Sequence, residues 1–260
     1  MNSTVTLTVD DGVAVARMTR PEALNALDRS TLRALIDAVR HAADTDGVRA
    51  LVLAGGPRAF CVGDDLKEAA TLDADELAGH VDRLQELTRL LRSLAQPSVA
   101  AIAGYALGGG LELALACDLR IAAANARFAC PEPAWGLTAT GGATRLLPRI
   151  VGDGWARELL LFGRELSAEE ALRIGLVTRL VAPEGLDEAA RDAALAAARS
   201  SPAALADTRH LLAAPDHLSF DEVLDRETAT VLTAFASDEA RDGLAAFAAG
   251  RRAPRAPGAA

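Results

Sequence analysis

Tyr105-Ala-Leu-Gly-Gly-Gly-Leu-Glu-Leu-Ala-Leu-Ala-Cys117 is an apolar run that contains three consecutive glycines and a single carboxylate, that of Glu112. If Leu111 to Cys117 opens a helix, Gly108 to Gly110 lie at its start. The first amides of a helix have no intrahelical partner and carry the positive end of its dipole. Glycine lets another group approach them closely. The run therefore predicts a helix whose first turn is a site for negative charge.

Glu112 lies in the first turn of this expected helix. The residues three and four positions away from it are glycine, leucine and alanine, so no cation on the same helix pairs with it. Burial of such a carboxylate raises its pKa toward the range of a useful proton donor. Two interpretations stay open at this level: a catalytic acid or base, or an ordinary first-turn glutamate that complements the helix dipole from the solvent side.

A second carboxylate, that of Glu132, stands between Pro131 and Pro133. Pro131 fixes the turn before it, and Pro133 biases Glu132 toward extended backbone angles. It is either a positioned functional acid or a surface loop acid held between turn residues. Two carboxylates that converge beside an amide-lined anion site indicate proton transfer at a carbonyl compound whose oxygen becomes negative.

A third segment, Ala59-Phe-Cys-Val-Gly-Asp-Asp-Leu-Lys-Glu68, follows a buried-strand pattern. Gly63 permits a backbone turn that exposes the amide of Asp64. Common alternatives to this kind of site are missing from the sequence. Gly108-x-Gly110 lacks the third glycine of a dinucleotide fingerprint, no Gly-Lys pair forms a phosphate loop, and neither G-x-S-x-G nor H-E-x-x-H occurs.

Composition narrows the class of protein. The 260 residues are 50% hydrophobic and 24% charged with a net charge of −9, which fits a folded chain with one sizeable core or a core plus a small appendage. Without clustered Lys and Arg, a nucleic-acid surface is not expected. Three cysteines without C-x-x-C spacing argue against a disulfide framework or structural zinc. No signal-peptide or membrane-span pattern is found, so we expect a soluble cytoplasmic protein.

Strand and helix patterns alternate up to about residue 180 and are followed by helices alone, which predicts an α/β core with a helical C-terminal part. Residues 250–260 are expected to be frayed. The expected strands are 5–9, 13–18, 49–53, 98–103, 119–124 and 176–181, and the expected helices are 28–43, 76–94, 111–117, 186–198, 203–212 and 220–249.

In this order, the segments resemble the crotonase, or enoyl-CoA hydratase/isomerase, superfamily over nearly the whole chain. The resemblance is carried by Arg20-Pro-Glu-Ala-Leu-Asn-Ala-Leu27, Phe60 to Glu68, Ala103-Gly-Tyr-Ala-Leu-Gly-Gly-Gly-Leu-Glu-Leu113, Cys117-Asp-Leu-Arg-Ile121, Phe128 to Gly136, Leu147-Pro-Arg-Ile-Val-Gly152 and Gly243 to Arg252.

This resemblance implies an α/β fold: a spiral of repeated ββα units over residues 1–185 that holds an acyl-CoA site. Residues 186–260 would form a helical region for trimerisation, giving a trimer or a dimer of trimers. The implied substrate is an acyl-CoA thioester. Neither a metal nor a cofactor is expected, because CoA is part of the substrate.

The resemblance also implies roles for individual residues. The amides of Asp64 and Gly109 would hold the thioester oxygen as it becomes an enolate, while Glu112 and Glu132 position water and move its proton. Lys67, with Arg251 or Arg252 of a neighbouring subunit, would meet the CoA phosphates. The CoA moiety would lie along Ala23, Leu24, Val62, Gly63, Asp65, Leu66, Lys67 and Gly108.

The chain departs from the superfamily pattern at two places. Asp64 stands where a small residue is usual, and Thr138-Ala-Thr-Gly-Gly-Ala-Thr144 replaces a glycine-rich pattern, with Thr140 at a glycine position. We expect Trp135 and Thr140 to narrow or polarise the acyl pocket. The leading hypothesis is hydration of a 2-enoyl-CoA. Two alternatives are double-bond isomerisation through Glu132 alone and a non-catalytic protein that binds acyl-CoA or serves as a scaffold.

Overall fold

The strands form two sheets in the computed structural model, which describes residues 4–215 and 217–250. The larger sheet has the order β1-β2-β3-β5-β7-β10 and the smaller one β4-β6-β8-β9. Neighbouring strands are parallel except in the pairs β1–β2 and β8–β9. The strands are β1 Val5–Asp10, β2 Val13–Met18, β3 Ala50–Ala54, β4 Ala59–Cys61, β5 Ser98–Ile102, β6 Tyr105–Leu107, β7 Leu119–Ala123, β8 Arg127–Ala129, β9 Leu166–Ser167 and β10 Arg179–Val181.

A ββα unit repeats along the chain, as expected. In each unit the first strand joins the larger sheet, the second joins the smaller sheet, and a helix follows: β3, β4 and α2–α3, then β5, β6 and α4, then β7, β8 and α5. The helices are α1 Arg29–Asp44, α2 Leu66–Ala69, α3 Ala74–Ser93, α4 Gly109–Ala116, α5 Ala143–Leu160, α6 Ala168–Arg173, α7 Leu186–Ala198, α8 Pro202–Leu212, α9 Phe220–Phe235 and α10 Asp238–Ala248, with short 3₁₀ turns η1 Pro21–Ala23, η2 Glu132–Trp135 and η3 Pro183–Gly185.

Both faces of the larger sheet are covered by helices, and all five residues of its strand β3 are therefore buried. Leu51 and Leu53 point into the main core, which helices α1, α3 and α4 share. Ala50 and Val52 point the other way, into a second core closed by α7. Because successive side chains of a strand alternate between faces, a strand covered on both sides reads as a continuous apolar run.

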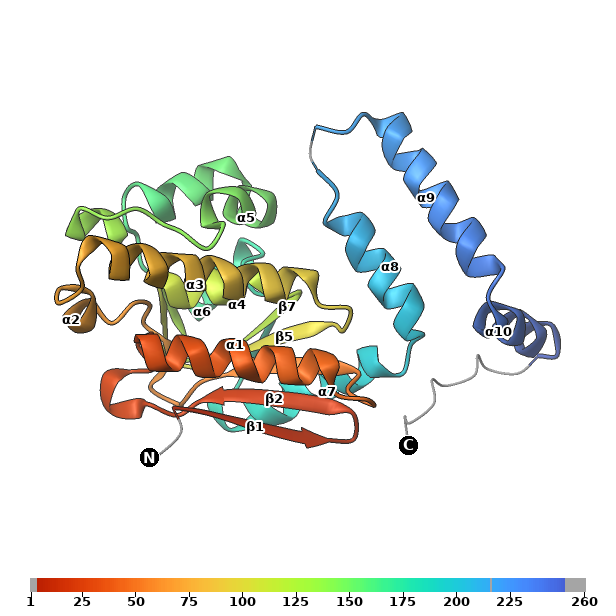
Figure 1. Ribbon diagram of the computed structural model, residues 1–260, viewed down its shortest axis with the longest axis horizontal. Helices are drawn as coiled ribbons and strands as arrows, with labels where there is room; N and C mark the ends of the chain where they lie inside the picture. The colour runs from red at the N-terminus through yellow and green to blue at the C-terminus, as the bar shows by residue number, and fades with distance from the viewer. Residues whose placement is uncertain (1–3, 216, 251–260) are drawn as a thin grey trace.

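The C-terminal part divides after α7, not before it. Alanines of α7, including Ala190 and Ala194, are fully buried against the sheet, so this helix packs as part of the core. Helices α8, α9 and α10 leave the sheets, and Figure 1 shows α8 and α9 side by side beyond the core. The single helix expected over 220–249 is wrong: Ser237 caps a new helix through Ala240 N at 3.1 Å and thereby separates α9 from α10. Most of the expected frayed tail, residues 251–260, lies outside the described residues.

Three cysteines, Cys61, Cys117 and Cys130, are buried and free. In the described part of the chain no helix is long and apolar enough to cross a membrane. Within the same residues, no group of three or more histidine, cysteine or acidic side chains is arranged to hold a metal ion.

Candidate active site

The glycine triplet forms the start of α4 at a point where several segments meet. Gly108 is the N-cap residue, with φ of 49° and ψ of −126°. A Cβ on Gly108 would lie 2.7 Å from Glu132 Oε1, and one on Gly110 would lie 2.1 Å from the carbonyl oxygen of Cys61 in β4. Glycine is therefore required at both positions, because any side chain would collide with the second carboxylate or with the neighbouring strand.

The amides of Asp64 and Gly109 lie beside each other. Gly63 has a φ of 87°, and a Cβ placed on Gly109 would lie 3.8 Å from Asp64 N. Among the described residues, neither amide donates to a backbone or side-chain acceptor, whereas the adjacent amides of Asp65 and Gly108 bond to Leu27 O and Ala129 O. Two adjacent amides without acceptors, one of them at a helix start, can donate together to one ligand oxygen.

Glu112 is buried, with only 3% of its surface exposed, and both of its carboxylate oxygens accept hydrogen bonds from one residue. Thr140 N donates to Oε1 at 2.6 Å, and Thr140 Oγ1 donates to Oε2 at 2.9 Å. Burial raises the pKa of Glu112 to about 7, against the two Thr140 hydrogen bonds, and the charges of Glu132 and Asp64 add to the rise. At neutral pH this carboxylate therefore exchanges a proton readily. The solvent-facing interpretation of Glu112 is wrong.

Glu132 is the first residue of the 3₁₀ turn η2, and its side chain reaches the start of α4. Its Oε1 lies against Gly108, 2.7 Å from the place that a Cβ of that residue would take, and its Oε2 is buried without a hydrogen-bond partner among the described residues. Burial raises the pKa of Glu132, and the charge of Asp64 contributes to the rise. Glu132 is thus a positioned acid with one oxygen available to a ligand, not a loop acid on the surface.

Asp64 brings a third carboxylate to the site. Its Oδ1 lies 3.2 Å from Nε2 of His80, a residue of α3 that is only 3% exposed. The other ring nitrogen of His80, Nδ1, is buried without a partner among the described residues. The side chain of Asp64 is held toward α3, while its amide remains available beside Gly109.

The segments expected to bind CoA are tied to each other through the backbone. Leu27 N donates to Gly63 O at 2.8 Å, and Asp65 N donates to Leu27 O at 3.1 Å. The Asp65 carboxylate pairs with Arg20 at 2.8 Å and caps α2. This arrangement places the remaining expected positions near one another: Ala23 ends η1, Leu24 follows with φ of 51°, and Val62, Leu66 and the exposed Lys67 flank the Gly63–Asp65 turn. Arg251 and Arg252 lie outside the described residues.

Asn25 and His80 complete this arrangement without having been predicted for it. Asn25, with φ of 56° and 1% exposure, donates from Nδ2 to the carbonyl oxygens of Ala59 and Phe60 and accepts from Arg20 N, so it fastens the first segment to β4. His80 gave no signal beyond its place in an amphipathic helix. Thr140 is a departure from the superfamily pattern that was expected to affect the acyl pocket, but its contact with Glu112, across 28 residues, was not expected.

Comparison with known proteins places this geometry in a family. Residues 8–255 match the enoyl-CoA hydratase/isomerase family. The chain is 36% identical to crotonyl-CoA hydratase of Syntrophomonas wolfei, over 96% of each chain, and 34% identical to short-chain-enoyl-CoA hydratase of Clostridium acetobutylicum, over 94% of each. The crystal structure of enoyl-CoA hydratase from Bacillus anthracis superposes with a TM-score of 0.92 at 31% identity, covering 97% of this chain and 98% of that one. The chain therefore belongs to the enoyl-CoA hydratase/isomerase family.

Proposed function

We propose that the protein catalyses the reversible syn addition of water across the double bond of a 2-enoyl-CoA thioester. The observation that carries the proposal is the meeting of two carboxylates with two amides that have no acceptor among the described residues. Glu112 is buried, and Glu132 is half-buried with its Oε2 fully enclosed. Relatives named as enoyl-CoA hydratases support the general reaction.

In this proposal the amides of Asp64 and Gly109 bind the thioester oxygen. Attack of water at C3 moves electron density onto that oxygen, and the two amides stabilise the resulting enolate. One such donor typically contributes about 10²–10³ in kcat. The amide of Gly109 adds the positive end of the α4 dipole to the same point.

Glu112 and Glu132 then share the proton transfers. One ionised carboxylate takes a proton from the water as its oxygen bonds to C3, and the other, protonated carboxyl delivers a proton to C2. The pair therefore ends the reaction with its total number of protons unchanged. A pKa of about 7 for Glu112 suits this exchange, because acid and base forms are then both populated near neutrality.

Isomerisation of a 3-enoyl-CoA is the second candidate, and one observation favours it. Both oxygens of Glu112 already accept hydrogen bonds from Thr140, whereas Oε2 of Glu132 has no partner among the described residues. Under this alternative, Glu132 alone moves a proton between C2 and C4, and Glu112 takes no part.

Incubation with crotonyl-CoA separates the two candidates, since hydration removes the absorbance of the conjugated enoyl thioester. We expect that absorbance to fall. If short, medium and branched 2-enoyl-CoA substrates all remained unchanged while a 3-enoyl-CoA was converted, the hydratase proposal would be overturned.

We also propose that the chain assembles as a trimer or a dimer of trimers through its C-terminal helices. Helices α9 and α10 carry large apolar side chains that are mostly exposed in a single chain, among them Phe220 at 75%, Leu232 at 65% and Phe247 at 81%. Apolar surface of this extent indicates a protein interface. Light scattering should give three or six times the chain mass, and a monomer mass at micromolar concentration would contradict the proposal.

A further inference from the structure

A cavity of about 240 Å³ lies at the end of α4 opposite to the active site. The helix begins at Gly109 and ends at Ala116, which separates the two places by about 12 Å at 1.5 Å per residue. The volume is far above the ~15 Å³ that a single water needs. The described residues that line it include Arg92, Asp118, Arg120, Arg149 and Arg209.

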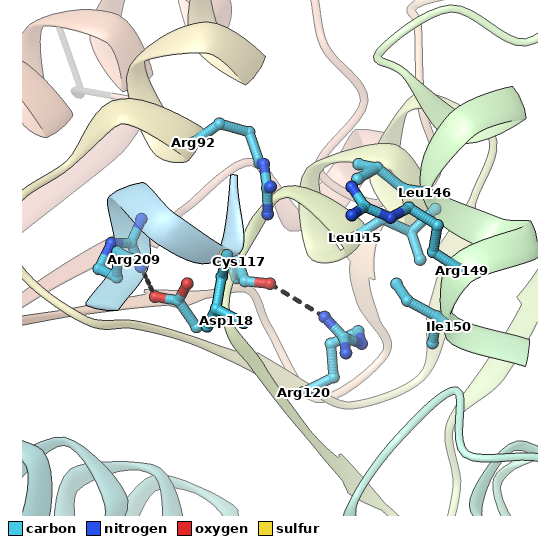
Figure 2. Close-up of a pocket in the computed structure, with 10 residues that line it drawn as sticks. Arg92, Leu115, Cys117, Asp118, Arg120, Leu146, Arg149, Ile150 and Arg209 are labelled. Atoms are coloured by element: carbon cyan, nitrogen blue, oxygen red, sulfur yellow. Dashed lines mark hydrogen bonds and ion pairs between the residues drawn. The ribbon is translucent and has the colours of Figure 1, made fainter. Parts of the chain in front are cut away.

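Four guanidinium groups surround this cavity, and each comes from a different element. Arg92 is in the last turn of α3, Arg120 in β7, Arg149 in α5 and Arg209 in α8 (Figure 2). Among the described residues that line the cavity, Asp118 is the one acid, against four arginines.

Three of these arginines already have partners: Arg149, Arg120 and Arg209. Arg120, only 6% exposed, donates to the carbonyl oxygens of Leu176 and Cys117 at 2.7 and 2.9 Å. Arg209 donates to Leu94 O and Leu91 O at the end of α3 and pairs with Asp118. Helix C-termini attract cations, so these bonds explain why two arginines are here.

Asp118 is not available to the other guanidinium groups. Its Oδ2 already accepts hydrogen bonds from Ser98 N and Ser98 Oγ at 2.7 and 2.8 Å and pairs with Arg209. Arg92 makes no hydrogen bond or ion pair with any described residue, although its guanidinium lines the cavity.

The positive charges also repel one another. Burial lowers the pKa of Arg92, and the charge of Arg149 lowers it further; burial and the charge of Arg92 act in the same way on Arg120 and Arg209. Arginine does not lose its proton in proteins, so deprotonation cannot relieve the repulsion. An anion in the cavity would do so.

We propose that this cavity binds a small multivalent oxyanion, such as phosphate or a compact di- or tricarboxylate, between Arg92, Arg120 and Arg149. The planar forks of guanidinium groups match the oxygens of phosphate and carboxylate, and charge-assisted bonds of this kind are about twice as strong as neutral ones. The anion would also link α3, β7 and α5 at the place where α8 leaves the core.

Arg92→Gln is the decisive variant, because Arg92 has no described partner whose loss would confuse the result. Arg83→Gln, on the same helix but outside the cavity, is the matched control. The full-length protein is titrated with inorganic phosphate at constant ionic strength, with chloride as the reference ion, and both Tm and calorimetric heat are followed. Arg92→Lys, which keeps the charge without the fork, is run in parallel in case Arg92→Gln fails to fold.

We expect phosphate to raise the Tm of the wild type and of Arg83→Gln in proportion to the logarithm of its concentration, with saturable heat. Arg92→Gln should bind at least about tenfold more weakly, and Arg92→Lys should fall between the two. Without added anion, Arg92→Gln should be as stable as the wild type or more so, since one repelling charge is gone.

A second source of the same chemistry is a carboxylate from another copy of the chain. In that case phosphate has no effect on the wild type, but Arg92→Gln lowers the assembled mass in light scattering and Arg83→Gln does not. This result supports an oxyanion site that a carboxylate of another copy occupies. The proposal is overturned if phosphate stabilises Arg92→Gln as well as the wild type. It is also overturned if neither phosphate binding nor assembly depends on Arg92.

Discussion

Replacing Thr140 with valine removes one hydrogen bond to Glu112 while keeping the side-chain shape. The Oγ1 donor at 2.9 Å from Glu112 Oε2 is lost, and the backbone donor to Oε1 at 2.6 Å remains. A hydrogen bond to a charged group is worth about 1.5–3 kcal/mol, and one pKa unit corresponds to about 1.36 kcal/mol. The ionised form of Glu112 should therefore lose enough stabilisation to raise its pKa by about one to two units above the wild-type value of about 7.

The assay is the pH dependence of kcat/KM with a 2-enoyl-CoA. Whether the reaction needs Glu112 ionised or protonated, the limb with an apparent pKa near 7 should move to higher pH in Thr140→Val. Because the two glutamates interact, this limb describes the pair. Thr138→Val, an exposed threonine of the same loop, is the control and should leave the limb in place. A folded Thr140→Val enzyme with an unshifted limb would refute the Thr140–Glu112 contact in the working enzyme.

Three further predictions concern the same site. Glu112→Gln should be more stable than the wild type at pH 8 by roughly 3 kcal/mol, because a pKa raised from 4.5 to about 7 makes wild-type stability fall as pH rises through that window. The difference in unfolding free energy should vanish below about pH 4.5, and equal stability at pH 8 would contradict the burial of this charge. Gly109→Pro should lose about 10²–10³ in kcat because the amide that donates to the thioester oxygen is missing, whereas Gly109→Ala should stay active, since a Cβ there meets nothing closer than 3.5 Å. Equal activities of the two variants would remove the Gly109 amide from the mechanism. Asp64→Ala should keep the backbone amide but lower the apparent pKa of the carboxylate limb in the pH profile, because the charge of Asp64 raises the pKa of both glutamates. An unchanged or raised apparent pKa would argue against that coupling.

Long periodic segments of the fold could be predicted from the sequence, and short ones could not. The hairpin of β1 and β2 and helices α1, α3 and α7 follow from apolar spacing over many residues. Strands β4, β6 and β8 have three residues each, too few to show a period. The break between α9 and α10 depends on a single capping serine inside a continuous helical pattern.

The candidate site was predictable where glycine and proline constrain the backbone. The helix after the glycine triplet follows from such local rules, although α4 begins at Gly109 and not at the expected Leu111. The extended conformation expected for Glu132 before Pro133 is wrong, because Glu132 is the first residue of the 3₁₀ turn η2. Contacts between distant segments left no local signal: Thr140 with Glu112, and His80 with Asp64. The arginine cavity is the extreme case, because its four guanidinium groups come from four elements and meet only in the folded chain.

The central claim is that Glu112 and Glu132 act together on one water. Its most direct test is the measurement of kcat/KM for Glu112→Gln, Glu132→Gln and the double variant on 2-enoyl and 3-enoyl thioesters. We expect each single change to cost about 10²–10⁴ in hydration, and the double variant to resemble the worse single one because both groups serve the same step. A severe loss for Glu132→Gln with a mild one for Glu112→Gln on 3-enoyl thioesters would support isomerisation instead. Near wild-type rates for both single variants on every thioester turned over would contradict the account.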